Sequence, residues 1–125
     1  MPSSSSRVLC YRDLLAWQKA VALVLEIYRR TESFPKAEIY GLVSQLRRAA
    51  VSVPSNIAEG HARRSTGEFR QFLGYALGSL TEMETQIIIA ERLGYLCKES
   101  SHDLLVRTAE VGRIINGLIR SLRRY

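Results

Sequence analysis

Residues 65–94 read STGEFRQFLGYALGSLTEMETQIIIAERLG, with apolar side chains at intervals of three and four residues. This spacing places one face of an α-helix against a core, and it predicts a helix about 40 Å long at 1.5 Å per residue. Ser65 and Glu68 have the spacing of a capping box at the start, and Gly94 is a natural stop. The buried face is expected to comprise Phe69, Leu73, Ala76, Leu80, Met83, Ile87 and Ala90.

An earlier helix is predicted between Asp13, a suitable helix cap, and Phe34-Pro35. The proline sets the end because it disfavours helical geometry in the residue before it. The combined width of two apolar stripes indicates contact with more than one neighbouring helix. One stripe is Leu14, Trp17, Val21, Val24 and Tyr28, and the other is Ala16, Ala20, Leu23 and Ile27.

A second helix is predicted from Ile39 to Ala62, although Pro54 lies inside its apolar pattern. A proline removes one backbone hydrogen bond and clashes with the preceding turn, at a cost of about 3 kcal/mol, so we expect a kink near Ser52. The last helix is predicted to begin near Ser100 or Ser101 and to present an apolar face as far as Leu122.

The 125 residues, 46% of them hydrophobic, suit one domain with its own core. No segment alternates with a period of two, and the connections at 33–38, 63–65 and 95–99 are short enough to make neighbouring helices antiparallel. We therefore predict an all-α fold, an up-down-up-down four-helix bundle over residues 11–125, behind a mobile Ser-rich tail at residues 1–10.

Several functional classes find no support in the sequence. Charged and amide residues interrupt the longest apolar runs, so no membrane span is predicted, and the two cysteines indicate a reducing, cytoplasmic setting. The single Glu-x-x-His pair, Glu99 and His102, falls short of the two that a di-iron bundle needs. No nucleophile with a base and no phosphate-binding loop is recognisable. We predict no enzyme activity, no metal and no small-molecule cofactor.

Arginine dominates the charge of the chain. Lys and Arg number 18 against 12 for Asp and Glu, a net charge of +6, and only three of the 18 are lysines. A guanidinium group binds phosphate through two parallel hydrogen bonds, which favours an acidic partner. The candidate nucleic-acid contacts are Arg47, Arg48, Arg63, Arg64 and Arg70, expected to gather around the bend at Pro54.

A polar cluster of Ser52, Ser55, Asn56 and Glu59 lies among these arginines. A structural interpretation stays open, in which Glu59 pairs with Arg63 and the Ser55 and Asn56 side chains satisfy carbonyls freed by Pro54. A second basic cluster, at the end of the last helix, offsets the helix dipole and consists of Arg113, Arg120, Arg123 and Arg124.

Gly74 and Gly78 lie one turn apart and predict a close contact with another helix, within the chain or between copies. Together with Phe69, Phe72 and the wide apolar surface of the first helix, they indicate more apolar surface than a lone bundle covers. Self-association is therefore expected.

The run SVPSNIAEG at 52–60, with EIYGL at 38–42 and SQLRRAA at 44–50, resembles the 23S rRNA-intervening sequence proteins. The resemblance covers about 11–96 and implies a cytosolic four-helix bundle without an established enzymatic activity. Some members of that family are encoded inside intervening sequences of large-subunit rRNA genes. The family is similar to the accessory protein of diversity-generating retroelements, which implies a pentamer that engages nucleic acid and a reverse transcriptase.

These observations predict a non-enzymatic homo-oligomer that binds nucleic acid, RNA rather than DNA, through backbone phosphates. The alternative is a protein-interaction scaffold whose arginines form ion pairs between copies. A small-ligand pocket near Pro54 is a third interpretation.

Overall fold

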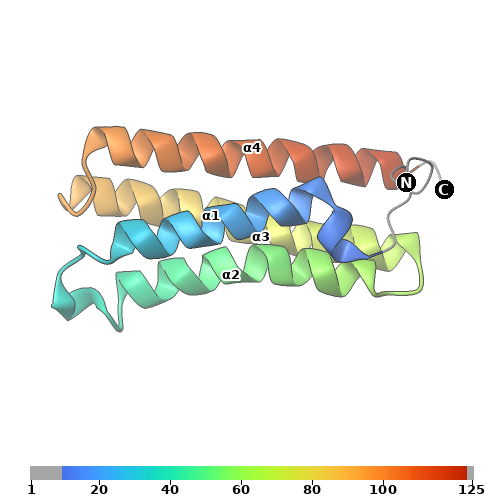
Figure 1. The fold of residues 1–125 in the computed structure, drawn as a ribbon, viewed down its shortest axis with the longest axis horizontal. Coiled ribbons are helices and arrows are strands. Elements are labelled where there is room, and N and C mark those ends of the chain that lie inside the picture. The colour runs from blue at the N-terminus through green and yellow to red at the C-terminus, as the bar shows by residue number, and fades with distance from the viewer. Residues whose placement is uncertain (1–9, 124–125) are drawn as a thin grey trace.

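The computed structural model describes residues 10–123 and contains four long helices within that range. They are α1 (Leu15–Thr31), α2 (Leu42–His61), α3 (Thr66–Arg92) and α4 (Lys98–Leu122), and two single 3-10 turns, η2 (Tyr11–Asp13) and η3 (Lys36–Glu38), precede α1 and α2. Successive helices run in opposite directions (Figure 1). The fold is the predicted all-α four-helix bundle. The tail predicted at residues 1–10 lies, apart from Cys10, outside the described residues.

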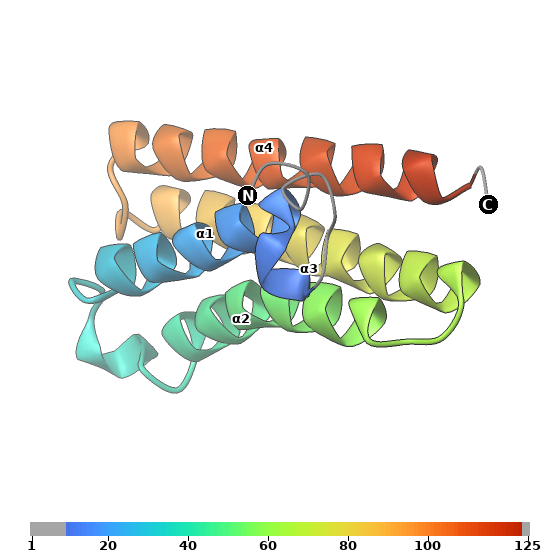
Figure 2. The ribbon, with the colours of Figure 1, turned by 45° about the vertical axis from the view of Figure 1, so that its right-hand side comes forward.

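The four helices pack in a ring around one core. Each contacts the next along the chain, and α1 also contacts α4, so α1 and α3 stand diagonally opposite each other (Figure 2). The predicted face of α3 is buried from Leu73 to Ala90, and only Phe69 at its start is half-buried. None of the described helices is both long and apolar enough to cross a bilayer.

The start of α1 differs from the prediction. Its N-cap is Leu14 rather than Asp13, because the Asp13 carboxylate closes η2 by accepting a hydrogen bond of 3.3 Å from the Cys10 amide. The second predicted stripe, which begins with Ala16 and Ala20, is the buried one, and the small alanines sit at the centre of the bundle. Tyr28 of the other stripe is exposed.

The start of α2 depends on a contact that links distant segments. The helix begins at Leu42, and Ile39, predicted to be helical, precedes it and is 55% exposed. The Glu38 carboxylate accepts hydrogen bonds from the Leu42 amide at 3.1 Å and from the Tyr95 hydroxyl at 2.9 Å. A Cβ at Gly41 would lie 2.8 Å from the same carboxylate, so only glycine fits there without a shift.

The remaining helix ends follow local rules. The Ser65 hydroxyl accepts a hydrogen bond from the Glu68 amide at 3.1 Å, which confirms the predicted start of α3, and Gly94 has the positive φ of 84° that stops the helix. The predicted start of α4 is wrong by about one turn. Cys97 is the N-cap, and its thiol accepts a hydrogen bond from the Ser100 amide at 3.4 Å.

Candidate nucleic-acid interface

Pro54 is buried inside α2, and the helix continues through it to His61. The missing N–H of Pro54 leaves the carbonyl of Ala50 without its usual helical partner. The Asn56 side chain, predicted to satisfy a freed carbonyl, instead donates to the Ser52 carbonyl at 2.8 Å, and Ser55 is exposed. That part of the structural interpretation is therefore wrong, and the kink at Ser52 stays a prediction.

Ser52 joins α2 to α3. Its hydroxyl donates to the Ala49 carbonyl at 2.8 Å and is also hydrogen-bonded to the Ser79 hydroxyl of α3. The hydrogen bond between the two half-buried hydroxyls links the two helices, and the bond to Ala49 stays within α2. The serine of the family motif thus has a packing role.

Glu59 and Arg63 form the predicted ion pair one helical turn apart, with 2.8 Å between Oε2 and Nη2. The Arg63 guanidinium also lies 4.7 Å from the centre of the Phe72 ring on α3. The guanidinium of Arg63 therefore already has two partners within the bundle, although its side chain remains 42% exposed.

The structure does not bring the five candidate arginines together. Fifteen residues of mostly helical chain separate Arg48 from Arg63, roughly 20 Å along the axis. Arg47 donates hydrogen bonds to the Thr31 hydroxyl at 2.9 Å and to the Tyr28 carbonyl at 3.2 Å, and its guanidinium lies 4.4 Å from the centre of the Tyr28 ring. Arg47 thus binds the carboxyl end of α1, and Arg48 is exposed on a different surface.

Arg70 has a partner that its position in the sequence does not reveal. Its Nη1 donates to the Leu122 carbonyl, 3.2 Å away, in the last turn of α4. A cation at the carboxyl end of a helix satisfies a free carbonyl and opposes the helix dipole. The contact places the start of α3 beside the end of α4, and with it the arginines of the α2–α3 turn at the same end of the bundle as Arg120 and Arg123.

We call this end of the bundle the basic end. It carries six described arginines against three carboxylates, Asp13, Glu59 and Glu68. One of those carboxylates is paired with Arg63, and another accepts from the backbone of Cys10. The arginines come from η2, the α2–α3 turn, the first turns of α3 and the end of α4, and they are Arg12, Arg63, Arg64, Arg70, Arg120 and Arg123.

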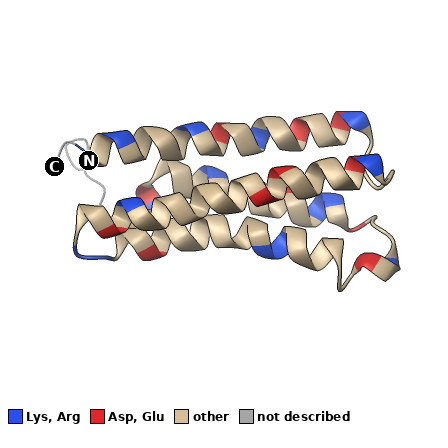
Figure 3. Ribbon diagram, turned by 180° about the vertical axis from the view of Figure 1, so that it is seen from behind, with Lys and Arg blue, Asp and Glu red and all other residues tan. Residues whose placement is uncertain are grey.

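The opposite end is closer to electrical balance. Seven basic residues, with Arg47 counted there because it binds the end of α1, and six acidic residues lie at it, and four of the six ion pairs between described residues join residues of this end. Arg30 of α1 forms ion pairs with Glu26, with 2.8 Å between Nε and Oε1, and with Asp103 of α4, with 2.8 Å between Nη2 and Oδ2. Figure 3 shows red and blue side by side at this end, whereas the α2–α3 turn is blue. The excess positive charge of the bundle is therefore concentrated at the basic end.

Four arginines of the basic end are exposed and have no ion-pairing carboxylate among residues 10–123: Arg12, Arg64, Arg120 and Arg123. The sequence assigned the last two to a separate cluster with a dipole role. The predicted antiparallel topology could have shown that these arginines share one end of the bundle, because it places the turn at 63–65 beside the end of the last helix. Arg12 was missed because it is isolated in sequence.

Gly74 and Gly78 lie on the exposed side of α3. No atom lies within 4 Å of a Cβ built at either position, apart from their own helix backbone and chain neighbours. The close contact predicted within the chain is therefore wrong, and a contact between copies stays a prediction. The glycine that a neighbouring helix does require is Gly60, where a Cβ would lie 2.6 Å from the Cβ of Phe72.

Comparison with known proteins identifies the family. The family model described as "23S rRNA-intervening sequence protein" matches residues 12–117. The chain belongs to this family. Among solved structures it is similar to a protein of unknown function from the S23 ribosomal protein family of Bacteroides thetaiotaomicron, with a TM-score of 0.76 and 19% sequence identity over 84% of this chain and 98% of the other. This likeness supports the fold alone. No curated protein matches the chain.

Proposed function

We propose that the protein is a non-enzymatic, cytoplasmic homo-oligomer that binds nucleic acid, RNA rather than DNA, through its basic end. The observation that carries the proposal is the unequal charge of the two ends, with an excess of exposed arginines at one end and nearly equal numbers of basic and acidic residues at the other. Arginines on a rigid scaffold neutralise backbone phosphates and release counterions, which supplies affinity without base recognition.

The arrangement favours Arg64, Arg120 and Arg123 as the principal phosphate contacts. Their side chains project from the α2–α3 turn and from the end of α4, and all three are exposed. Arg63 is paired with Glu59, and Arg70 binds the Leu122 carbonyl. Their guanidinium groups are therefore less free to bind phosphate, and they contribute to the positive charge around the other arginines. Arg47, which binds the end of α1, is withdrawn from the proposed interface.

Self-association is proposed from apolar side chains that the bundle leaves uncovered. Leu15 and Leu25 are 54% and 63% exposed on α1, and Tyr75, Ile88 and Ile89 are exposed on α3. Because α1 and α3 are diagonal in the bundle, exposed apolar side chains occur on two helices that do not contact each other. Exposed apolar residues on two different helices suit the unlike surfaces of a head-to-tail ring, and the resemblance to the retroelement accessory protein favours five copies.

The alternative of a protein-interaction scaffold makes a different prediction for the same arginines. If Arg64 and Arg123 join copies of the chain, replacing them by alanine lowers the oligomer mass measured by light scattering. If they bind nucleic acid, the mass stays constant and only the affinity for nucleic acid falls.

The proposal is tested by fluorescence anisotropy with nuclease-treated protein, a labelled structured RNA and a duplex DNA of equal length. We expect binding at low and physiological salt, tighter for the RNA, with an affinity that falls steeply as salt increases. Absence of binding to either nucleic acid at low salt would overturn the proposal and favour the scaffold.

A further inference from the structure

A polar groove of about 570 Å³ lies between α2 and α3, apart from the basic end. A volume of this size is within the range of small-ligand sites, about 300–1,000 Å³. The hydroxyls of Ser52 and Ser79, bonded to each other, link its two walls. Its other lining residues are Tyr40, Ser44, Gln45, Arg48, Ala49 and Glu82.

Arg48 and Glu82 line this groove from opposite helices without forming an ion pair. Both residues are exposed, and neither has any other ion-pair partner among residues 10–123. A groove with a free cation on one wall and a free anion on the other suits a ligand that has an anionic group and hydrogen-bond donors.

A largely buried glutamine side chain holds the Glu82 carboxylate in place. Gln86, one turn along α3 and only 6% exposed, donates from Nε2 to Glu82 Oε2 at 3.3 Å. An ionised carboxylate has about four acceptor positions, so most remain free for a ligand. The N1–H and N2–H₂ groups of guanine are adjacent donors that match the two oxygens of one carboxylate, and adenine, cytosine and uracil lack such a pair on their pairing edges.

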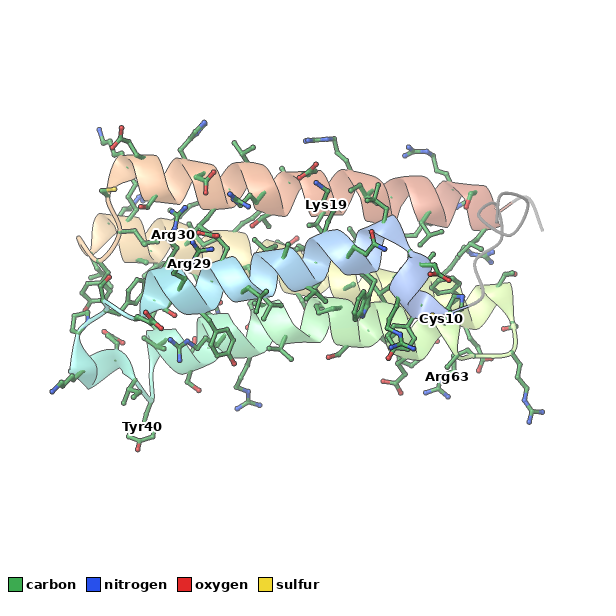
Figure 4. All side chains as sticks on the ribbon, in the orientation of Figure 1. Cys10, Lys19, Arg29, Arg30, Tyr40 and Arg63 are labelled. Atoms are coloured by element: carbon green, nitrogen blue, oxygen red, sulfur yellow. The ribbon has the colours of Figure 1, made fainter. Side chains whose placement is uncertain are left out.

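We propose that the α2–α3 groove binds a guanine nucleotide, with the base edge on Glu82 and the phosphate on Arg48. This inference rests on the proposed function in that the nucleotide belongs to a single-stranded segment of the bound RNA. Tyr40 is 94% exposed at one end of the groove and points away from the bundle (Figure 4), where it can stack on a base. The basic end binds phosphates without distinguishing bases, and the groove adds selectivity for one base.

The test uses free mononucleotides, which do not need the basic end. Amide chemical shifts of nuclease-treated, isotope-labelled protein are followed while GMP, AMP, CMP or UMP is added. We expect shifts at Ser79 and Glu82, with GMP bound about tenfold more tightly than AMP, since a bidentate base contact discriminates by about that factor or more. Glu82→Gln should remove the preference for GMP, and Arg48→Ala should lower the affinity of the protein for all four nucleotides.

Matched controls come from the neighbouring groove between α3 and α4. Glu84→Gln and Arg113→Ala make the same chemical changes on residues that line that other groove, and they should leave GMP binding unchanged. Equal affinity for the four nucleotides, or an unchanged preference in Glu82→Gln, would overturn the guanine site. If GMP binds selectively but RNA does not bind, only the proposed function fails, and if RNA binds without any preference for GMP, only the groove inference fails.

Discussion

Arg70 Nη1 lies 3.2 Å from the Leu122 carbonyl oxygen, so the first turns of α3 hold the last turn of α4. This hydrogen bond explains why arginines more than 50 positions apart in sequence meet at the basic end. It also gives Arg70 a structural role that the exposed Arg64 does not have.

Replacing Arg70 by alanine should therefore destabilise the bundle. We expect the free energy of unfolding to fall by about 1–2 kcal/mol, because a charged donor to a half-buried carbonyl is lost. Chemical denaturation with circular dichroism measures the change. Arg64→Ala is the control and should alter stability by less than about 0.5 kcal/mol, as expected for an exposed substitution; equal effects of the two would contradict the structural role of Arg70.

Replacing glycine by alanine should lower the stability of the bundle at Gly60 of α2 and raise it at Gly74 and Gly78 of α3. Gly60→Ala places a methyl group 2.6 Å from the Phe72 Cβ and 3.0 Å from the Phe69 ring, and we expect a loss of about 1–3 kcal/mol. Gly74→Ala and Gly78→Ala meet open space and should each raise stability by up to about 1 kcal/mol through helix propensity. Thermal unfolding of the three variants distinguishes these outcomes, and a stabilised Gly60→Ala would refute the close contact of α2 with α3.

The ion pairs of Arg30 with Glu26 and Asp103 should contribute more to stability than the exposed ion pair between Arg107 and Asp103. Glu26 is buried, and Arg30→Ala leaves its carboxylate with Arg29 alone. We expect a loss of about 2–3 kcal/mol. Arg107→Ala removes an exposed partner of Asp103 and should cost less than about 1 kcal/mol; a loss as large as that of Arg30→Ala would contradict this ranking.

Asp103 should make stability depend on pH in acid. Hydrogen bonds from Arg107 and then from Arg30 lower the pKa of Asp103 below its ordinary value of 3.8. A carboxylate with a lowered pKa in the folded state stabilises the fold above the ordinary value, and this stabilisation is lost as the pH falls below it. Asp103→Asn should flatten the pH profile of the melting temperature in that range. An identical profile in wild type and variant would contradict the assignment.

Cys97 should react faster with alkylating reagents than an unperturbed thiol. The hydrogen bonds from the Ser100 hydroxyl and amide lower the pKa of Cys97 from its ordinary 9.0, so more thiolate is present near neutral pH. Iodoacetamide rates across pH, measured in a Cys10→Ser background, should give a midpoint below 9.0. Ser100→Ala should move the midpoint upward; an unchanged midpoint would mean that the Ser100 hydroxyl has no part in it.

The sequence predicted those parts of the fold that depend on local signals. The apolar spacing along α3, the Ser65 cap and the Gly94 stop each act within a few residues, and the structure confirms all three. The starts of α1 and α4 were wrong because several adjacent residues can cap a helix. Asp13 closes a 3-10 turn, and Cys97 takes a place expected for serine.

The candidate site was predicted less well because its contacts are not local. Arg47 binds the Thr31 hydroxyl and the Tyr28 carbonyl at the end of α1, and Arg70 binds a carbonyl at the end of α4. Any residue type could provide these carbonyls, so the sequence does not mark them. The Glu59–Arg63 pair, one helical turn apart, was predictable from spacing. Exposed arginines such as Arg64 and Arg120 become one surface only after the helices are placed.

The salt dependence of RNA affinity, measured by anisotropy for three forms of the protein, tests the central claim that the basic end binds nucleic acid. Arg64→Ala/Arg123→Ala removes two exposed charges from the basic end, and Arg92→Ala/Lys98→Ala removes two exposed charges from the opposite end of the bundle. We predict that the first double variant reduces the slope of log K against log salt by about 1–2, because each lost phosphate contact releases about one counterion fewer, and that the second matches the wild type. Equal slopes in all three, or a larger loss in the second variant, would contradict the claim.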